Sequence, residues 1–497
     1  MYHRRMTPIM GWASWNCFRT NITEQKLKEQ FDALVSTGLA ECGYEYANTD
    51  DGFFGGRGED GVLRFHKERF PNGIKVLADY AHSLGLKAGI YSEAGATSCG
   101  YYYDNEGENG VGVGLFGHEE QDLEMYLAEC GFDFIKVDWC GALREGVDEK
   151  QEYVKIGTIV REIGERLGRT IVFNVCRKFF PGIWVIDYAD SWRTAADIRP
   201  DFDSVVRQLD HAKPLRYFTA PGHVNDLDMM QIGNGLTHEE EKSHFAMWCM
   251  MSTPLMIGCD LTKISPDTLA ILKNEELIAL DQDPACHQAY VVKEYRDESG
   301  KNLLGEVWVK DLGYTRHSEK AIAFLNRSTA PLQMEITPYQ AGLGGSMLSL
   351  RDLWAHEDLP VTTPLSFTVP PHATFVFRAS STRECATEDI NKDLAYREPK
   401  PNPPLTRAIA RLCVQNGALL LDVRTREEYE KEHIKGALNT PYTEIYSHIA
   451  ETVPDLKTPC ILYCSKGLRS EQVRYTMQQM GYKYVFVLGG VGDDFTL

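Results

Sequence analysis

The sequence lacks long hydrophobic runs and is short of positive charge. Its first residues, MYHRRMTPIMGW, include basic side chains but no apolar stretch, so we expect neither a signal peptide nor a membrane-spanning segment. The chain has 52 lysines and arginines against 71 aspartates and glutamates, a formal net charge of -19. This balance argues against nucleic acid or an anionic membrane as a partner. We therefore expect a cytoplasmic bacterial protein with a small-molecule ligand.

Regular cysteine spacing is also missing. The 13 cysteines are an odd number in a chain of 497 residues, and none of them forms a CxxC pair. Neither a disulfide framework nor a zinc site is supported, and most of the cysteines should be buried as small hydrophobic residues. We expect no metal and no cofactor.

A glycine-rich phosphate turn is absent after the first strand-like segment, which disfavours a doubly wound open sheet. From residue 9 to about 280, strand-like runs instead alternate with helical patterns eight times. Eight βα units of this size are typical of a (β/α)8 barrel, which we place at residues 1–286. Its strands are predicted to end near Trp15, Asp51, Ser92, Cys140, Cys176, Asp197, Asp228 and Asp260.

The segment Phe132–Cys140, FDFIKVDWC, is predicted to form a buried strand that ends on polar residues. Lys136, Asp138 and Cys140 share the period of one strand face, so their side chains can point into one cavity. A strand-end aspartate with a lysine two residues before it suits a nucleophilic or electrostatic role. The alternative for Asp138 taken alone is the N-cap of the next helix.

The carboxyl ends of barrel strands meet at one mouth, where active sites lie. The residues predicted at this mouth are Trp15, Asp50, Asp51, Tyr91, Lys136, Asp138, Cys140, Arg177, Arg193, Asp197, Asp226 and Asp228. Carboxylates accept hydrogen bonds from sugar hydroxyls and aromatic faces pack on sugar C–H groups, so the set suits a neutral polyhydroxylated ligand. Several aspartates could instead bind a divalent metal, but Lys136 and Arg193 disfavour that alternative.

Two further domains are predicted after the barrel. Residues 287–378 contain short strand-like runs and no long helix, which predicts an antiparallel β-sandwich packed against the barrel, without a catalytic cluster. Residues 379–405 are polar and proline-rich at their end, so we expect a linker. Residues 406–497 alternate between strand and helix patterns and should form a small α/β domain.

Cys464 is the strongest candidate for a reactive thiol. It ends the buried strand CILYC, and the loop from Cys464 to Arg469 opens a helix. Backbone N–H groups, the positive helix end and the side chains of Lys466 and Arg469 all favour a thiolate there. A buried structural cysteine is the alternative.

Residues 6 to about 380 resemble the family 27 glycoside hydrolases, which include α-galactosidases and α-N-acetylgalactosaminidases. The likeness lies in MGWASWN, NTDDGF, GIYSEAG, FIKVDWCG, SWRTAADI and APGHVNDLDMMQIGN, in that order. It implies a retaining mechanism with Asp138 as nucleophile and Asp197 as acid/base, two carboxyl groups about 5–5.5 Å apart. Lys136 should keep Asp138 ionised. Asp197 must start protonated, so it should be the more desolvated of the two.

The resemblance also implies a sugar pocket. Asp50 and Asp51 would bind the hydroxyls at C6 and C4 of a galacto-configured sugar, and Arg177 stands where the best-known members read the C2 substituent with a glutamate or a small residue. The pocket would be completed by Trp15, Tyr91, Lys136, Arg193 and Asp228. We expect an exo-acting enzyme on small-molecule or oligosaccharide substrates with terminal α-galactose; α-N-acetylgalactosamine and β-L-arabinopyranose are the alternatives.

Two cysteines enter the candidate site through the same resemblance. Cys99 and Cys140 match positions that form a disulfide beside the active site in secreted relatives. A cytoplasmic chain would leave them reduced unless the site protects them. Cys176 lacks the partner that these relatives place before Trp192.

Residues 406–497 resemble a single rhodanese domain, through LLDVRTREEYEKEHIKGALNTP and YCSKGLRS. The six-residue loop from Cys464 to Arg469 has the length that suits a persulfide sulfur, which Arg469 and the loop amides would stabilise. The resemblance implies sulfurtransferase activity. Besides a glycosidase for galactose or for one of the alternative sugars, a further hypothesis is that the barrel only binds sugar as a scaffold and the protein's only activity is sulfur transfer. The sequence leaves open whether the protein is a homo-oligomer.

Overall fold

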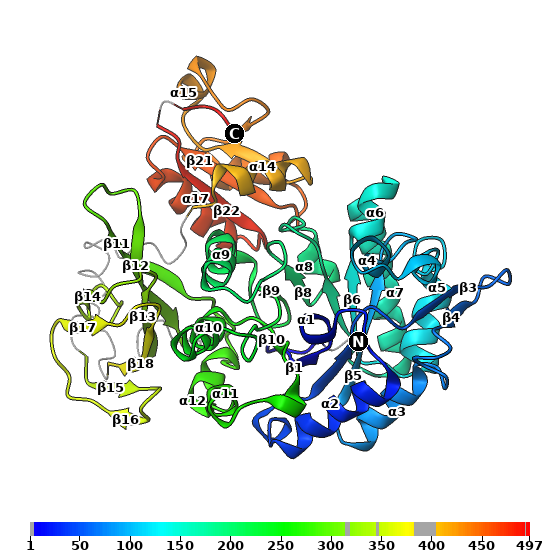
Figure 1. Ribbon diagram of the computed structural model, residues 1–497. Helices are drawn as coiled ribbons and strands as arrows, with labels where there is room; N and C mark the ends of the chain where they lie inside the picture. The colour runs from blue at the N-terminus through cyan, green and yellow to red at the C-terminus, as the bar shows by residue number, and fades with distance from the viewer. Residues whose placement is uncertain (1–3, 314–318, 344–346, 382–403, 493) are drawn as a thin grey trace. The chain divides into compact units, whose positions relative to one another are not determined.

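The computed structural model describes residues 4–313, 319–343, 347–381, 404–492 and 494–497 (Figure 1). The chain divides into two compact units, the first holding a barrel and a sandwich and the second mainly a small α/β domain. Of the linker expected at 379–405, residues 382–403 lie outside the described residues. No helix within the described ranges is long and apolar enough to cross a membrane.

The predicted barrel is present. Eight parallel strands pair in the order β10-β1-β2-β5-β6-β7-β8-β9 (Figure 1). Two backbone hydrogen bonds join β10 to the segment that follows β9, from Met230 N–H to the Met256 carbonyl at 2.7 Å and from Gly258 N–H to the Met230 carbonyl at 3.1 Å. The strands are β1 (Met10–Ala13), β2 (Tyr46–Thr49), β5 (Lys87–Glu93), β6 (Phe134–Asp138), β7 (Val172–Val175), β8 (Ser191–Arg193), β9 (Val224–Asp226) and β10 (Leu255–Ile257).

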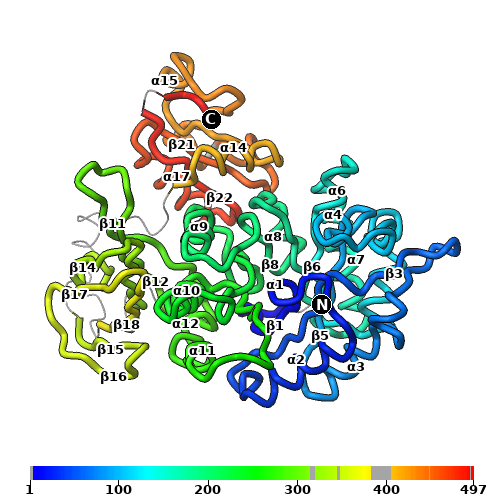
Figure 2. The backbone as a smooth tube through the Cα atoms, in the orientation of Figure 1, coloured from blue at the N-terminus to red at the C-terminus, as the bar shows by residue number. Residues whose placement is uncertain are grey.

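Amphipathic helices follow the strands. In α7 (Glu149–Leu167) buried Ile156 and Val160 lie one turn apart, the Asp148 carboxylate caps the first turn, and Gly168 at φ 65° ends the helix. The other helices are α1 (Trp15–Phe18), α2 (Glu24–Ser36), α3 (Lys75–Ser83), α4 (Cys99–Tyr103), α5 (Glu119–Leu123), α6 (Cys140–Glu145), α8 (Val185–Tyr188), α9 (Phe202–Ala212), α10 (His238–Met251), α11 (Pro266–Leu272) and α12 (Glu275–Asp281). Figure 2 shows a hairpin, β3 (Phe54–Arg57) and β4 (Leu63–Phe65), that extends from the barrel.

A tightly packed core supports the site from inside the barrel. Apolar side chains from several strands meet there, and Trp15 packs against this cluster from the mouth. The buried members of the cluster are Ile9, Ala13, Tyr46, Phe134, Val172, Met229 and Met256. Because close-packed interiors deform little, the strand ends hold the site residues in fixed positions.

The sandwich consists of a six-stranded sheet, β11-β12-β13-β18-β15-β16, and a two-stranded sheet, β14-β17. As predicted, it packs against the barrel: Ser243 Oγ donates to the His372 carbonyl at 2.6 Å and Asn274 Nδ2 to the Leu353 carbonyl at 2.8 Å. Its strands are β11 (Tyr290–Arg296), β12 (Leu303–Asp311), β13 (Glu319–Asn326), β14 (Leu332–Ile336), β15 (Ser349–Asp352), β16 (Glu357–Asp358), β17 (Leu365–Val369) and β18 (Thr374–Ser380).

The C-terminal α/β domain has a parallel four-stranded sheet in the order β20-β19-β21-β22 with its own hydrophobic core. Cys464 is the last residue of β21, and Gly467 precedes α17, so the predicted strand, loop and helix are all observed. The elements are α14 (Arg407–Gln415), β19 (Leu419–Asp422), α15 (Arg426–Lys431), β20 (Leu438–Asn439), α16 (Ile445–Thr452), β21 (Cys460–Cys464), α17 (Leu468–Gln479) and β22 (Val485–Gly490).

Candidate active site

Most of the predicted mouth residues line one cavity of about 230 Å³ at the carboxyl ends of the barrel strands. Asp50 and Tyr91 line a smaller cavity of about 40 Å³, which shares Lys136, Arg193 and Asp228 with the first. The predicted residues around the larger cavity are Trp15, Cys99, Lys136, Asp138, Cys140, Arg177, Arg193, Asp197 and Asp228.

Lys136 joins two carboxylates at the floor of the site. Its Nζ lies 2.9 Å from Asp50 Oδ2 and 3.6 Å from Asp138 Oδ1. Burial opposes the charge of Lys136, but Asp138 and Asp50 outweigh it and raise the pKa of Lys136 well above its usual value. Burial raises the pKa of Asp138 to about 6, even though Lys136 lowers it. Lys136 acts on Asp138 in the predicted direction, and Asp138 is largely ionised at neutral pH.

Asp51 lies next to Asp50, but its carboxylate is engaged by the backbone. Its Oδ2 accepts the N–H of Gly100 at 2.6 Å and its Oδ1 that of Gly52 at 2.7 Å. Burial raises the pKa of Asp51 to about 7. The residues that line the two cavities, as far as the structure describes them, do not include Asp51.

Asp197 and Asp228 share the guanidinium of Arg193, whose Nη2 lies 3.2 Å from Asp197 Oδ1 and 2.6 Å from Asp228 Oδ2. The Asp197 side chain is 71% exposed and that of Asp138 only 12%, so the prediction that Asp197 is the more desolvated carboxyl is wrong. Burial among the groups at the mouth raises the pKa of Asp197, but the charges of Arg193 and Lys136 outweigh this and lower that pKa below its usual value.

Asp228 is held rigidly on a strained backbone. It has φ 82°, a conformation rarely adopted by residues other than glycine, and its Oδ2 accepts the N–H of Ile198 at 2.8 Å. Burial raises the pKa of Asp228 to about 7, against the opposite effect of Arg193. A non-glycine residue strained in this way beside a cavity is a sign of function.

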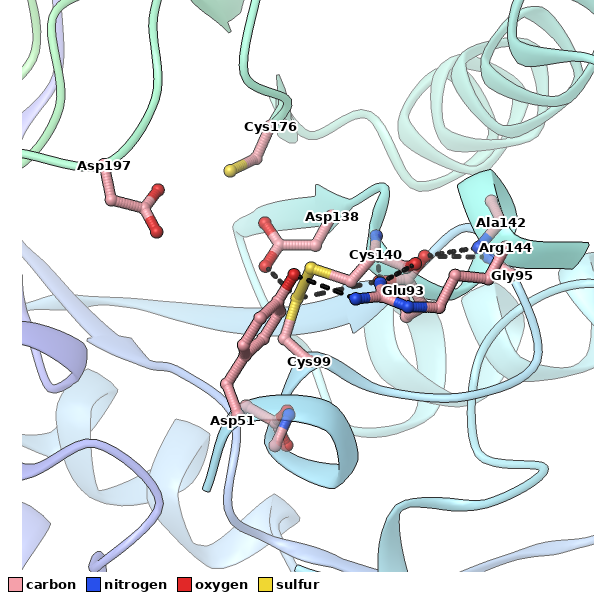
Figure 3. Close-up of a disulfide and its surroundings, with 12 residues drawn as sticks. Asp51, Glu93, Gly95, Cys99, Asp138, Cys140, Ala142, Arg144, Cys176 and Asp197 are labelled. Atoms are coloured by element: carbon pink, nitrogen blue, oxygen red, sulfur yellow. Dashed lines mark hydrogen bonds between the residues drawn. A yellow bond between two sulfur atoms is a disulfide. The ribbon is translucent and has the colours of Figure 1, made fainter. Parts of the chain in front are cut away.

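A disulfide joins Cys99 and Cys140 next to the nucleophile candidate (Figure 3). A cytoplasmic location would leave these two thiols reduced. In the structure, however, α4 and α6 both begin beside neighbouring strand ends, which brings the two Cα atoms to 5.5 Å, within disulfide reach. Asp138 Oδ2 lies 3.1 Å from Cys99 Sγ, so the disulfide forms part of the wall around this carboxylate.

Glu93, at the end of β5, was not predicted as a site residue. It is fully buried, and its carboxyl accepts N–H groups of Gly95 at 3.1 Å, Cys140 at 3.0 Å and Ala142 at 3.2 Å (Figure 3). Burial, followed by the charge of Asp138, raises its pKa to about 8. The strand-end position of Glu93 in GIYSEAG was the available signal.

Cys176 was also missed as a site residue, although the strand after which it lies was predicted. It is a buried free thiol that lines the cavity (Figure 3). A hydrogen bond from this thiol lowers the pKa of Asp138, and Arg193 Nη1 lies 3.7 Å from its sulfur. Ten described cysteines are free, eight of them buried, which fits the predicted role of most cysteines as small hydrophobic residues.

Arg177 lines the cavity but is not a free charge, because its guanidinium pairs with Glu149 at the start of α7. Its Cζ lies 5.9 Å from the centre of the Phe179 ring. Trp15 lies just after β1, and Arg19 Cζ lies 4.2 Å from the centre of its ring. Both residues can contact a ligand in the cavity.

The C-terminal domain has a second candidate site. Cys464 is buried, and its sulfur accepts the Gly467 N–H at 3.1 Å. Burial opposes the thiolate, but backbone N–H groups of the loop lower the pKa of Cys464 below its usual value. Arg469 forms a two-pronged ion pair with Glu428, at 2.6 and 2.8 Å. The hydrogen bonds to Glu428 raise the pKa of Arg469, and Cys464 raises it by a smaller amount.

The comparisons with known proteins agree with this geometry. Residues 7–283 match the family described as alpha galactosidase A, residues 305–379 its C-terminal beta sandwich domain, and residues 406–492 the rhodanese-like domain. The chain is 35% identical over 384 residues to a probable alpha-galactosidase of Dictyostelium discoideum, an alignment that covers 76% of this chain and 93% of the relative.

Solved structures give the same answer. A putative alpha-galactosidase/melibiase of Bacteroides fragilis has 32% identity and a TM-score of 0.64, covering 75% of this chain and 79% of the other. Alpha-galactosidase I of Mortierella vinacea has 26% identity and a TM-score of 0.67, covering 76% and 98%. The chain therefore belongs to the alpha galactosidase A family of glycoside hydrolases and carries a rhodanese-like domain at its C-terminus.

Proposed function

We propose that the barrel is a retaining α-galactosidase that releases terminal α-linked galactose through a covalent glycosyl-enzyme. The observation that carries this proposal is the pair Asp138 and Asp197, whose carboxylates point toward one another across the cavity (Figure 3). One is enclosed beside Lys136 and the other is open to solvent. Two carboxyl groups with such different surroundings suit the two roles in glycoside hydrolysis.

In the first step, a carboxylate oxygen of Asp138 attacks C1 of the sugar while the bond from C1 to the leaving oxygen breaks and Asp197 gives that oxygen a proton. In the second step, Asp197 takes a proton from water, the water oxygen attacks C1, and the bond to Asp138 breaks. Asp197 is ionised in the free protein because of Arg193. A bound sugar that covers Asp197 removes it from water and raises its pKa toward the value that an acid needs.

Galactose is favoured as the sugar because the floor of the site presents Asp50 beside Lys136, as the motif NTDDGF implies for a galacto-configured ring. The similar protein of Dictyostelium discoideum is described as a probable alpha-galactosidase, and that of Bacteroides fragilis as a putative alpha-galactosidase/melibiase. We place Arg177, fixed by Glu149, near the C2 substituent. Its guanidinium N–H groups can donate a hydrogen bond to a hydroxyl at C2.

The test is hydrolysis of p-nitrophenyl α-galactoside, α-N-acetylgalactosaminide and β-L-arabinopyranoside by the full chain and by Asp138→Asn. We expect the α-galactoside to be preferred and its turnover to disappear in the variant, while the variant stays folded. Asp133→Asn, on the same strand segment but outside the cavity, is the matched control for the substitution. Preference for another sugar, or turnover by Asp138→Asn, would contradict the proposal.

We propose that the C-terminal domain transfers sulfur through a persulfide on Cys464. A sulfur atom carried on this thiolate would meet the same loop N–H groups that stabilise the thiolate itself. The expected result is thiosulfate-to-cyanide transfer that Cys464→Ser abolishes and Cys413→Ala, a buried thiol on α14, preserves. No transfer by the intact chain would contradict this role.

The domain boundaries at 286/287, 378/379 and 405/406 and the cytoplasmic bacterial origin stay predictions. The disulfide between Cys99 and Cys140 gives the location a direct test, because disulfides are rare in cytosolic proteins. Thiol labelling of the protein in intact cells distinguishes the two states.

A further inference from the structure

The outer part of the active-site cavity is positively charged, although the chain as a whole is negative. Two of the cations there have carboxylate partners: Arg177 pairs with Glu149, and Arg19 lies 3.0 Å from Asp104. Besides Lys136 and Arg193 beside the carboxylates, four basic side chains line the cavity, namely Arg19, Arg144, Arg177 and Lys178. Several cations thus line the same cavity as the proposed catalytic carboxylates.

Arg144 and Lys178 are the two cations whose charge is not already matched. Both are exposed, and neither forms an ion pair with a carboxylate within the described part of the chain. Arg144 donates instead to neutral acceptors, the Cys140 carbonyl at 2.7 Å and the Tyr103 hydroxyl at 3.1 Å. Positive charge is therefore available to a ligand in this part of the cavity.

The ring of Tyr103 brings these two cations together. The Arg144 Cζ lies 5.5 Å and the Lys178 Nζ 6.0 Å from its centre. The three side chains come from α4, from α6 and from the segment after β7, so separate parts of the chain converge on one place. Such convergence is a feature of a binding site rather than of scattered surface charge.

Exposed apolar surface accompanies the cations. Leu143 is 65%, Phe179 57% and Tyr103 49% exposed, and all three line the same cavity. Large apolar side chains gathered at a cavity mark a surface that a ligand covers, and burial of this area favours binding by about 25 cal/mol per Å². The ligand that suits this place is apolar on one side and negatively charged.

The position of Lys178 indicates which end of the substrate meets this surface. Lys178 and Asp197, the proposed acid, line the same cavity, and the charge of Lys178 contributes to lowering the pKa of Asp197. The acid faces the oxygen of the leaving group, so a cation beside it lies on the leaving-group side of the scissile bond. In the proposed function the sugar binds instead beside Asp50 and Lys136, which line the smaller cavity.

We propose that the leaving-group side of the cavity selects anionic aglycones, in which an aromatic or other apolar group carries a carboxylate, sulfate or phosphate. This inference rests on the proposed glycosidase function and specifies its substrate class. Tyr103, Leu143 and Phe179 contact the apolar part, and Arg144 and Lys178 attract the negative charge.

The test compares 3-carboxyphenyl α-galactoside with its neutral methyl ester, using kcat/KM of the full chain at low and high salt. For each protein we take the ratio of kcat/KM for the acid to kcat/KM for the ester. The wild-type ratio is then divided by the ratio of the double variant Arg144→Gln/Lys178→Gln. This quotient cancels the different reactivity of the two phenols. We expect this quotient to be roughly five to ten, as two partly screened charges give, and to approach one at high salt. The double variant Arg144→Lys/Lys178→Arg should retain the preference.

A surface variant with the same type of charge change, Lys155→Gln on α7, is the control and should leave the ratio unchanged. If p-nitrophenyl α-galactoside is hydrolysed but the quotient is near one at low salt, or does not change with salt, the inference is overturned and the proposed function stands. If the wild-type chain hydrolyses no α-galactoside, the proposed function fails, and this inference fails with it.

Discussion

Replacing Lys136 by methionine should move the pH dependence of the barrel's activity. Lys136 Nζ lies 3.6 Å from Asp138 Oδ1 in a buried site. At an effective dielectric constant of about 20, opposite charges at this separation attract by about 4.6 kcal/mol, and each 1.36 kcal/mol corresponds to about one pH unit. The polar groups that remain around Asp138 and the solvent offset part of this loss. We therefore expect a net rise of roughly two units in the pKa of Asp138.

The sign follows from the role of Asp138, which reacts only when ionised. Activity should fall as the pH drops through the pKa of Asp138, about 6 in the wild type. In Lys136→Met this acidic limb should lie near pH 8, so at pH 7 the ionised fraction falls from roughly nine-tenths to roughly one-tenth.

The assay is kcat/KM for 2,4-dinitrophenyl α-galactoside between pH 4.5 and 9.5, because this leaving group departs without a proton from Asp197. Lys75→Met, which removes an exposed lysine paired with Asp79 on α3, is the matched control and should leave the limb at about pH 6. A Lys136→Met protein that is folded and shows its limb unmoved would refute the electrostatic argument.

Three further predictions follow. Asp197→Asn should slow phenyl α-galactoside by a hundredfold or more and the dinitrophenyl substrate less than roughly tenfold, since only the first needs protonation; equal losses in kcat/KM would remove Asp197 as the acid. Cys176→Ala should shift the acidic limb of the dinitrophenyl profile to higher pH, but by less than Lys136→Met does, because the thiol lowers the pKa of Asp138 through one hydrogen bond. A limb at lower pH than in the wild type would contradict this contact. Glu93 has a folded-state pKa raised to about 8, so the native protein binds this proton more tightly than the unfolded chain and loses stability as the pH rises from about 4.5 to 8. The melting temperature of Glu93→Gln, relative to that of the wild type, should therefore rise between pH 5 and pH 8. A difference in melting temperature that stays constant over this range would contradict the pKa shift.

The sequence was sufficient to predict the barrel because its eight strands are short, apolar and followed by amphipathic helices. It was also sufficient to bring Lys136 and Asp138 to one wall, since the period of a strand fixes which side chains share a face. Cys140 lines the same cavity, but the prediction that it ends the strand is wrong, because β6 ends at Asp138 and Cys140 begins α6. The disulfide of Cys99 and Cys140 was suggested only by the resemblance, because the proximity of α4 and α6 depends on which strands are neighbours.

The environment of Asp197 could not be predicted in the same way. Asp197 lies four residues beyond the end of β8, in a loop, and its exposure depends on how that loop folds over the mouth. Its pairing with Arg193 reverses the expected order of the two carboxyl pKa values. Arg144 and Lys178 were missed for a related reason, as they approach each other only through the ring of Tyr103.

The central claim, that Asp138 carries the sugar during turnover, is tested most directly by trapping the intermediate. The full chain would be incubated with 5-fluoro-α-galactosyl fluoride, digested, and its peptides analysed by mass spectrometry. The account predicts one fluorogalactosyl group on the peptide that contains Asp138, and none in Asp138→Asn. A label on another residue, or an active enzyme that inactivates without any label and releases β-galactose first from an α-galactoside, would contradict it.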